Sequence, residues 1–491
     1  MPFPMNDLIL LLPEIIVASI ASIIPVIWAF SSRDNRWLIL LIALAGNITA
    51  AAIALSSIGI ESTEIMGGQF TVDRFTTYLR LAILFVASAS LIMMVDQFEK
   101  VPFGAMASIL MFSTSGMLLL VGATDLILVF VAIELMSIPI YALTGMTRYR
   151  AGSVEAAIKY FTMGAFGTAI LAYGIAWTYG VTGSTSLKNI STVIAQSEMN
   201  SAFLFAMGLL LAGIAFKIAI VPFHAWTPDA YDGAPTPVTA FMSVAPKIAA
   251  FAILIRLIGV AYSPLTDTVQ VLLVTLATIT MIVGNLLAVS QQNVKRLLAY
   301  SSIAHSGYML AGISATTLVA GNMVYIGFHT LLYYAVAYAL MNLGAFGIIF
   351  WVEQNKNTVD LNGFKGLARS APVSALVMTL VLISLTGIPP TAGFFGKLFI
   401  IQTLVSSQLG WLAIILVLMS VVSAYYYLRI VVNMFMHEPD NVATEAKSGT
   451  ASMPDSIGFV VLVSGIGTLA LGIFANWLYQ FAVDSIALAA L

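Results

Sequence analysis

Cysteine is absent from this chain of 491 residues, and charged residues make up only 9% of it. The absence of cysteine excludes disulfides, zinc sites built on thiolates and cysteine-ligated iron–sulfur clusters from this chain. A net charge of −2 provides no electrostatic footprint for nucleic acid. A soluble domain carries about 25% charged residues, so much of the surface that water requires is missing. The composition therefore favours a membrane protein.

Hydrophobic residues make up 60% of the chain and gather in long runs. A helix needs about 20 apolar residues to cross the roughly 30 Å hydrocarbon core of a bilayer. Such runs recur along the sequence, which predicts an all-α polytopic membrane protein of about 14 transmembrane helices. The predicted spans are 8–30, 37–57, 74–95, 104–122, 124–146, 154–181, 202–230, 236–260, 267–289, 294–313, 319–351, 374–405, 411–435 and 456–480.

Lysine and arginine are distributed unequally between the two sets of loops. Loops that follow the odd-numbered spans hold most of them, and strongly basic loops face the cytoplasm. The sequence therefore predicts that both termini lie on the opposite, outer side of the membrane. The basic residues assigned to the cytoplasmic side are Arg33, Arg36, Lys100, Arg148, Arg150, Lys295, Arg296, Lys356, Lys365, Arg369, Arg429 and Lys447. Those assigned to the outer side are Arg74, Lys188 and Arg256.

Two predicted spans are interrupted by proline and glycine. They contain VPFHAWTPDAYDGAPTP at residues 221–237 and GIPPTAGFFG at residues 387–396. Proline removes a backbone donor and clashes with the preceding turn, and a break inside a membrane persists only where protein or water satisfies the freed groups. Paired breaks in two halves of a transporter indicate inverted repeats and the transport path. For the first run, an ordinary loop between two shorter helices is the alternative.

Several titratable side chains fall inside the predicted spans. A Lys, Arg or Asp at the centre of a membrane helix costs about 2.5–3.5 kcal/mol. Together they cost about as much as the whole stability of an ordinary domain. We therefore expect these residues to face the interior of the bundle and to line a hydrated route. They are Arg80, Glu134, Lys159, Lys217, Lys247, His329 and Lys397.

Lysine is the residue type that favours proton transfer. Burial lowers the pKa of a lysine from about 10.4 towards about 5–6, which permits reversible protonation near neutral pH, whereas arginine stays charged. A carboxylate such as Glu134 would hold a nearby lysine protonated and release the proton on withdrawing. Proton relay is one interpretation, and purely structural ion pairing is the other. Lys159 could also pair with Glu155 on the same helix face, Arg80 could reach the membrane interface, and Glu14 is expected at the interface.

The four histidines are candidates for proton transfer or ligation. His305 lies among small polar residues in AYSSIAHSGYML, and His329 lies in the following span. Imidazole titrates near neutral pH, so a role in a polar seam is the first interpretation and haem ligation is the alternative. His224, at the first break, could gate access or cap freed carbonyls. His437, in FMHEPDNV, is expected in an exposed loop.

Five stretches together resemble a known family. They are FKIAIVPFHAWTPDAYDGAPTPVTAFMSVAPKIAAFA at residues 216–252, and VFVAIELMSIPIYAL, YRAGSVEAAIKYFTMGAFGTAILAYGIA, GNLLAVSQQNVKRLLAYSSIAHSGYML and LTGIPPTAGFFGKLFI. They are similar to the signatures of the antiporter-like subunits of respiratory complex I, in the same order. Within these, the chain most resembles the subunit N family of bacterial NADH–quinone oxidoreductase, which is homologous to mitochondrial NADH dehydrogenase subunit 2.

The resemblance implies two inverted five-helix repeats, each with a broken helix. Residues 1–103 would form N-terminal helices 1–3, and 104–260 the first repeat, helices 4–8. Residues 261–435 would form the second repeat, helices 9–13, and 436–491 a loop and helix 14.

The resemblance also implies roles for individual residues. Glu134 matches the family's helix-5 glutamate, Lys217 and Lys397 match the lysines of the two broken helices, Lys247 matches the helix-8 lysine, and Lys159 matches a helix-6 lysine typical of subunit N. Together with the three histidines singled out above on their own chemistry, the predicted proton-transfer set is Glu134, Lys159, Lys217, His224, Lys247, His305, His329 and Lys397.

By resemblance, the chain is a proton-translocating membrane-arm subunit of NADH:quinone oxidoreductase in the bacterial cytoplasmic (inner) membrane, with its termini on the periplasmic side. It would carry no cofactor or metal, because flavin, iron–sulfur clusters and quinone chemistry would reside in partner subunits. Its partners would be membrane lipids and other membrane-arm subunits, including a neighbouring antiporter-like subunit and small membrane subunits. The alternatives are a subunit of a multisubunit Na+/H+ antiporter, an organic-solute transporter and a purely structural subunit.

Overall fold

The structure is a bundle built almost entirely of helices. The computed structural model describes residues 5–30, 35–59, 62–96, 102–197, 201–319, 322–438 and 452–487. In these ranges, 11 helices are long and apolar enough to cross a membrane. They are α2 (Leu12–Phe30), α3 (Arg36–Ser56), α4 (Arg74–Met94), α5 (Phe103–Gly122), α6 (Leu126–Thr144), α7 (Ala151–Thr182), α11 (Thr236–Arg256), α12 (Thr266–Val289), α14 (Phe328–Lys356), α18 (Gly410–Met436) and α19 (Asp455–Ile473).

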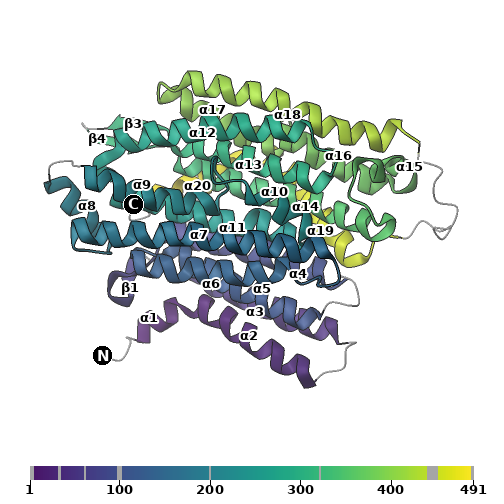
Figure 1. Ribbon diagram of the computed structural model, residues 1–491, viewed down its shortest axis with the longest axis horizontal. Helices are drawn as coiled ribbons and strands as arrows, with labels where there is room; N and C mark the ends of the chain where they lie inside the picture. The colour runs from purple at the N-terminus through teal and green to yellow at the C-terminus, as the bar shows by residue number, and fades with distance from the viewer. Residues whose placement is uncertain are drawn as a thin grey trace.

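Three further spans complete the bundle. Helix α13 (Val294–Ile313) is 20 residues long, sufficient to cross a membrane, but richer in polar residues than the other spans. The other two are broken helices, α9 (Ser201–Lys217) with α10 (Trp226–Gly233) and α16 (Pro372–Thr386) with α17 (Ala392–Ser406). The long helices run roughly parallel, from α2 at one edge of the molecule to α17 and α18 at the other (Figure 1). The predicted all-α membrane fold with about 14 spans is confirmed.

Short elements connect the spans and cover their ends. They are α1 (Met5–Leu10), β1 (Thr63–Ile65), η1 (Met66–Gly68), β2 (Phe70–Val72), α8 (Leu187–Gln196), η2 (Leu257–Ala261), η3 (Ser263–Leu265), β3 (Thr316–Val319), β4 (Asn322–Tyr325), η4 (Leu361–Phe364), α15 (Leu367–Ser370) and α20 (Ala475–Ala487). Strand β1 pairs antiparallel with β2, and β3 with β4. Helix α8 buries Leu187, Ile190 and Ile194, which form one apolar stripe on an otherwise exposed helix.

Two predicted spans have the wrong limits. The span predicted at 319–351 begins only at Phe328, because the β3–β4 hairpin occupies the preceding residues. That hairpin is apolar in sequence, and hydropathy cannot distinguish a short apolar strand from the first turns of a helix. The span predicted at 456–480 ends at Ile473, after which α20 begins.

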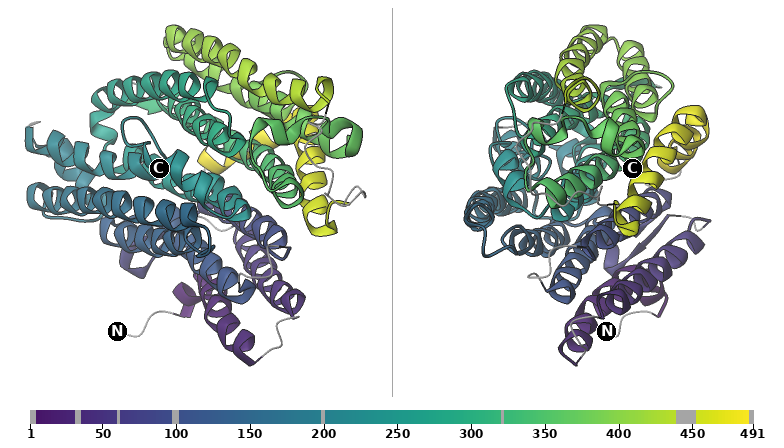
Figure 2. Two further views of the ribbon diagram at one scale, coloured as in Figure 1. Left: turned by 45° about the vertical axis from the view of Figure 1, so that its right-hand side comes forward. Right: turned by 90° about the vertical axis from the view of Figure 1, so that its right-hand side faces the viewer.

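Helices α19 and α20 pack against α14 and α4, so the C-terminal end of the chain lies beside its N-terminal third (Figure 2).

The first break is an unwound segment, residues 218–225, between α9 and α10. Backbone groups freed by the break have partners inside the protein. The Val221 amide donates to Thr280 Oγ1 at 3.1 Å, and Trp226 Nε1 donates to the Phe216 carbonyl at 3.1 Å. The segment is therefore a break inside the bundle, and the alternative of an ordinary loop is wrong.

The second break lies between α16 and α17. Gly387 ends α16 with a φ of 93°, a left-handed conformation that glycine adopts without strain. The ammonium of Lys397 donates to the carbonyls of Leu385 at 3.0 Å and Thr386 at 2.8 Å, which satisfies acceptors left open at the helix end. Both predicted breaks are confirmed. The division at residues 103, 260 and 435 stays a prediction.

Two buried ion pairs join α4 to other helices. Arg80 lies 2.7 Å from Glu14 of α2, and both side chains are buried. Arg256, at the end of α11, donates to both carboxylate oxygens of Asp73 at 3.1 and 3.0 Å. Arg80 faces the interior of the bundle, as predicted, and the alternative that it reaches the interface is wrong. Glu14, expected at the interface, is buried beside it. Each residue of these two pairs finds its counter-charge inside the bundle, which removes the need to reach water.

The predicted orientation depends in part on Arg33, Lys100 and Lys447, which lie outside the described residues. The side of the membrane that the termini face stays a prediction.

Candidate functional site

Lys217 is buried at the end of α9 and contacts hydroxyl groups of two neighbouring helices. Its side chain is 6% exposed. The ammonium donates to Ser137 Oγ at 3.1 Å and to Tyr141 OH at 3.2 Å, both on α6, and to Thr168 Oγ1 of α7 at 3.4 Å. The first break places the lysine here, because α9 ends at this residue.

A third residue, Thr168, connects Glu134 to Lys217 by hydrogen bonds. Thr168 Oγ1 donates to Glu134 Oε1 at 2.8 Å. Among the ion pairs of the described residues, none joins Glu134 to Lys217. The structure thus brings the two predicted residues together, with a hydroxyl group between them.

Lys247 contacts the facing helix, α13. It is 2% exposed, and its ammonium donates to the Ser302 carbonyl at 2.7 Å, to Ser302 Oγ at 2.6 Å and to Ser306 Oγ at 2.9 Å. Ser306 Oγ in turn donates to the carbonyl of Ile218 at 2.8 Å, the residue after Lys217. Hydroxyl groups of α13 therefore connect the Lys247 site to the first break.

His305 lies on the same helix between two tyrosines. Its Nδ1 is 2.6 Å from Tyr334 OH, and its Nε2 is 3.2 Å from Tyr427 OH. Tyr427 OH also hydrogen-bonds to Ser301 Oγ. Both ring nitrogens are thus engaged with tyrosine hydroxyl groups.

Lys397 is the buried lysine of the second break. Besides the Leu385 and Thr386 carbonyls, its ammonium donates to Ser420 Oγ of α18 at 3.0 Å, so each N–H group has an oxygen acceptor. No ion pair of the described residues involves Lys247 or Lys397. A mostly apolar cavity of about 400 Å³ adjoins Lys397. It is lined by Thr386, Gly387, Ile388, Phe394, Lys397, Leu398, Ile401, Leu416, Val417, Ser420, Val421 and Ala424.

The other histidines lie apart from these lysines. His329 Nε2 is 2.7 Å from Tyr479 OH, a contact that joins α14 to α20. His224 lies half-buried in the first break. His437 follows α18 and is exposed, as predicted.

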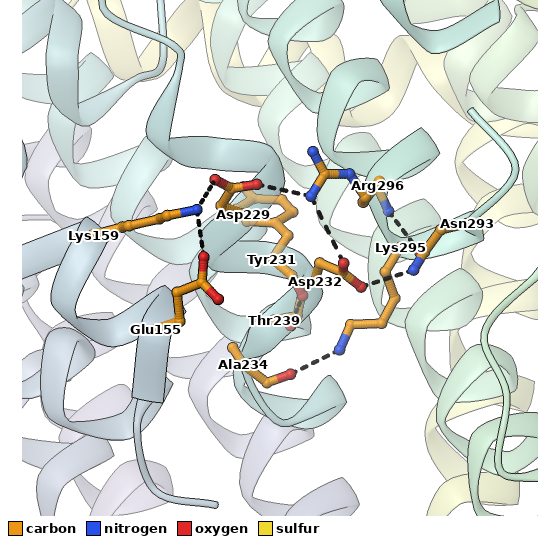
Figure 3. Close-up of polar contacts among 10 residues, drawn as sticks. All are labelled: Glu155, Lys159, Asp229, Tyr231, Asp232, Ala234, Thr239, Asn293, Lys295 and Arg296. Atoms are coloured by element: carbon orange, nitrogen blue, oxygen red, sulfur yellow. Dashed lines mark hydrogen bonds and ion pairs between the residues drawn. The ribbon is translucent and has the colours of Figure 1, made fainter. Parts of the chain in front are cut away.

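Lys159 belongs to a cluster of opposite charges at the surface (Figure 3). Its ammonium lies 2.7 Å from Glu155 and 3.1 Å from Asp229 of α10. Arg296 of α13 lies 2.8 Å from Asp229 and 3.7 Å from Asp232. The prediction that Lys159 faces the interior of the bundle is wrong, because its side chain is 48% exposed on the third turn of α7. These charges hold α10 against α7 and α13.

A cavity of about 350 Å³ lies within this charge cluster. It is lined by Arg150, Gly152, Ser153, Glu155, Ala156, Lys159, Asp229, Asp232, Gly233 and Arg296.

Comparisons with known proteins place the chain in a family. Residues 123–423 match the family model described as NADH:quinone oxidoreductase/Mrp antiporter, transmembrane. NADH-quinone oxidoreductase subunit N 1 of Solibacter usitatus is 37% identical to the chain, over 99% of this chain and 98% of that protein. The chain belongs to the NADH-quinone oxidoreductase subunit N family.

Solved structures agree with membership of the subunit N family. A chain of respiratory complex I from Thermus thermophilus with bound aureothin gives a TM-score of 0.79 at 32% identity, covering 95% of this chain and 98% of that chain. A chain of the Mrp complex from Dietzia sp. gives a TM-score of 0.85 at 21% identity, covering 98% of this chain and 96% of that chain, which shows a shared fold. The family resemblance seen in the motifs is confirmed.

Two further charged residues, Lys295 and Glu353, are buried although neither was singled out from the sequence. Lys295, assigned to a loop, is 2% exposed and donates to the Ala234 carbonyl at 2.7 Å. Glu353, at the end of α14, pairs with Arg150 at 2.8 Å and accepts from the Thr236 hydroxyl. Glu353 ends the apolar run GAFGIIFWVE, a signal for a partly buried carboxylate. Lys295 lacks such a signal, because it adjoins the polar stretch SQQNV.

Proposed function

We propose that this chain is a proton-translocating subunit in the membrane arm of NADH:quinone oxidoreductase, located in the bacterial cytoplasmic membrane. Family membership supports its place in that complex. One observation carries the proton-transfer role: Lys217, Lys247 and Lys397 are buried, and their ammonium groups are held by hydroxyl and carbonyl oxygens. A lysine held by neutral acceptors can lose its proton without leaving an unpaired carboxylate behind.

In this proposal the lysines act in the order of the helices that carry them. Lys217 exchanges a proton with Glu134 in the first half of the chain. Lys247 passes the proton laterally along α13, and Lys397 connects it to the exit half. His305, between its two tyrosines, extends the path between Lys247 and Lys397. Imidazole between two hydroxyl groups can accept a proton on one nitrogen and release one from the other.

The remaining predicted residues lie at the periphery of this path. We propose that His224 controls access at the first break, and that His329 extends the path towards α20 through Tyr479. A relay role for Lys159 stays a prediction. Its contacts with Glu155 and Asp229 favour an electrostatic role in holding α10.

We propose that the redox chemistry takes place in partner subunits and that this chain holds no redox centre. In the described ranges, no group of three or more His, Asp or Glu side chains is arranged to hold a metal ion.

Large apolar side chains are exposed on α6 and α7, including Ile127 and Phe166, and on α18, including Trp411 and Val421. Such surfaces fit lipids, the neighbouring antiporter-like subunit and small membrane subunits.

The second candidate function is that of a subunit in a multisubunit Na+/H+ antiporter, which the shared Mrp fold favours. The two functions differ in their dependence on sodium. We expect inverted vesicles containing the complex to acidify on addition of NADH, at the same initial rate in sodium-free choline buffer as in sodium buffer. Acidification is measured with a pH-sensitive fluorescent dye. Sodium-dependent proton exchange in vesicles without NADH oxidation would establish the antiporter function instead.

Lys159→Arg should leave NADH-driven pumping within about twofold of the wild type, because exposed ion pairs contribute about 0–1 kcal/mol and arginine preserves them. The same dye assay, normalised to the rate of NADH oxidation, measures this effect. Lys247→Arg is the matched comparison and should lose pumping, since arginine cannot release a proton. If the Lys159→Arg variant oxidises NADH normally but does not pump protons, Lys159 is a proton-transfer residue.

A further inference from the structure

Among the described residues, Thr168 is the one whose side chain hydrogen-bonds to both Glu134 and Lys217. It lies on α7, accepts from the Lys217 ammonium at 3.4 Å and donates to Glu134 Oε1 at 2.8 Å. The other two acceptors of Lys217, Ser137 Oγ and Tyr141 OH, have no described hydrogen bond to Glu134. A threonine hydroxyl has one proton to donate and two lone pairs to accept with, so these contacts give the triad a direction from lysine to carboxylate.

Thr168 differs from the other threonines of its helix. Thr162, Thr178 and Thr182 each donate to a backbone carbonyl one turn earlier in α7, which is the usual bond of a threonine inside a helix. Thr168 instead donates across to α6, where the acceptor is a carboxylate. A hydrogen bond to a charged acceptor is worth about twice a neutral one, which explains why this hydroxyl turns away from its own helix.

Aromatic rings and close helix packing surround the triad. The Lys217 ammonium lies 5.8 Å from the centre of the Tyr141 ring and 5.5 Å from that of Phe216, so aromatic rings cover part of the site. Gly167, next to Thr168, packs against Phe216, where an added Cβ would lie 2.8 Å from the ring. This close contact brings α7 near enough to α9 for the threonine hydroxyl to reach the lysine.

We propose that Thr168 is a relay residue that carries protons between Lys217 and Glu134. The proposal rests on the proton-pumping function proposed above. In the forward step, one N–H bond of the ammonium breaks as a new O–H bond forms at Thr168 Oγ1. The original O–H bond of Thr168 breaks as an O–H bond forms at Glu134 Oε1. Lysine becomes a neutral amine, the carboxylate becomes a neutral acid, and the threonine regains its hydroxyl. The reverse step restores both charges.

The test compares three substitutions on α7 in the intact complex. Thr168→Val keeps the shape of the side chain but removes the hydroxyl, and Thr168→Ser keeps the hydroxyl but removes the methyl group. Thr162→Val, on the same helix, is the control for loss of a threonine hydroxyl that bonds only to its own backbone. Protons pumped per NADH oxidised are measured in inverted vesicles, and assembly is checked on native gels.

The relay predicts that Thr168→Val lowers the proton-to-NADH ratio by at least about tenfold, since removal of a proton-transfer group lowers a rate by about 10²–10⁴-fold. Thr168→Ser and Thr162→Val should retain the wild-type ratio. A normal ratio in Thr168→Val would overturn the proposal, as would a loss in Thr168→Ser equal to that in Thr168→Val, since the methyl group would then be the important part. If valine prevents assembly, Thr168→Ala removes the same hydroxyl without filling the space and is read in the same way.

A parallel Lys217→Ala variant separates failure of the relay from failure of the function. If Lys217→Ala loses pumping and Thr168→Val does not, the relay is overturned and the pumping function stands. If Lys217→Ala also pumps normally, the proposed function itself is overturned.

Discussion

Lys217→Ala should abolish most NADH-driven proton pumping while the complex remains assembled. The substitution removes the ammonium that donates to Ser137, Tyr141 and Thr168, so Glu134 loses the cation at the end of its hydrogen-bonded chain. Loss of a group that transfers protons lowers a rate by about 10²–10⁴-fold, so we expect at least a tenfold fall in protons pumped per NADH oxidised. The measurement combines dye quenching and NADH oxidation in inverted vesicles.

Lys217→Arg is the matched variant for this experiment. Arginine preserves the positive charge and can donate to the same hydroxyl groups, but it does not release a proton. If Lys217 acts as a relay, arginine should pump as poorly as alanine while assembling normally. If Lys217 only balances the charge of Glu134, arginine should restore pumping. Undiminished pumping in the alanine variant would show that the buried lysines have only a structural role, and would favour the structural-subunit alternative.

One helix, α13, organises the centre of the site. Its Ser302 and Ser306 hold Lys247, and the ring of Tyr308 lies 4.7 Å from the Lys397 ammonium. His305 lies between Ser302 and Tyr308 in the sequence of this helix. A single helix therefore contacts lysines from both broken-helix halves of the bundle, which explains why α13 is richer in polar residues than the spans around it.

The sequence predicted those features that one segment of chain determines by itself. A run of about 20 apolar residues is sufficient to identify a span, and the prolines at 222, 389 and 390 were sufficient to locate both breaks. The buried lysines were also predictable, because a charge inside an apolar run is costly and therefore conspicuous. These features need no knowledge of which helices are neighbours.

Features that depend on neighbouring helices could not be predicted. Glu14 and Arg80 lie 66 residues apart, and nothing local to either shows that they meet. Glu14 alone resembles a residue near a helix end, which is why the interface was its expected location, and Arg80 was expected inside the bundle without a partner being identified. Thr168 is a neutral residue of a type common in membrane helices, so its place between Glu134 and Lys217 emerges only when α6, α7 and α9 are packed together.

The second large effect should come from the buried pair of Asp73 and Arg256. Both side chains are 0% exposed. Asp73 also caps α4 by accepting from the Thr76 amide at 2.7 Å, and Arg256 Nε donates to the Val121 carbonyl at 3.0 Å. The pair therefore ties the start of α4 and the end of α5 to the end of α11, the helix that carries Lys247.

Asp73→Asn should prevent stable assembly of the subunit. Asparagine can still cap α4, so the change isolates the loss of negative charge beside a buried arginine. An uncompensated buried charge costs about 3–5 kcal/mol, a large part of the roughly 5–15 kcal/mol that stabilises a folded domain. We expect a much lower amount of subunit in the membrane and a lower melting temperature of any complex that forms, measured by immunoblotting and by thermal unfolding of purified complex.

Two further variants decide whether the effect belongs to the pair. Lys188→Ala breaks an exposed contact of 3.9 Å with Glu64 and should change neither quantity, since exposed pairs contribute about 0–1 kcal/mol. Asp73→Asn combined with Arg256→Met removes both charges and should recover much of the lost assembly, because replacing a whole buried pair is often tolerated. If Asp73→Asn assembles like the wild type, the pair does not hold α11 in place, and the packing of α11 against α14, α4 and α5 is sufficient to position Lys247.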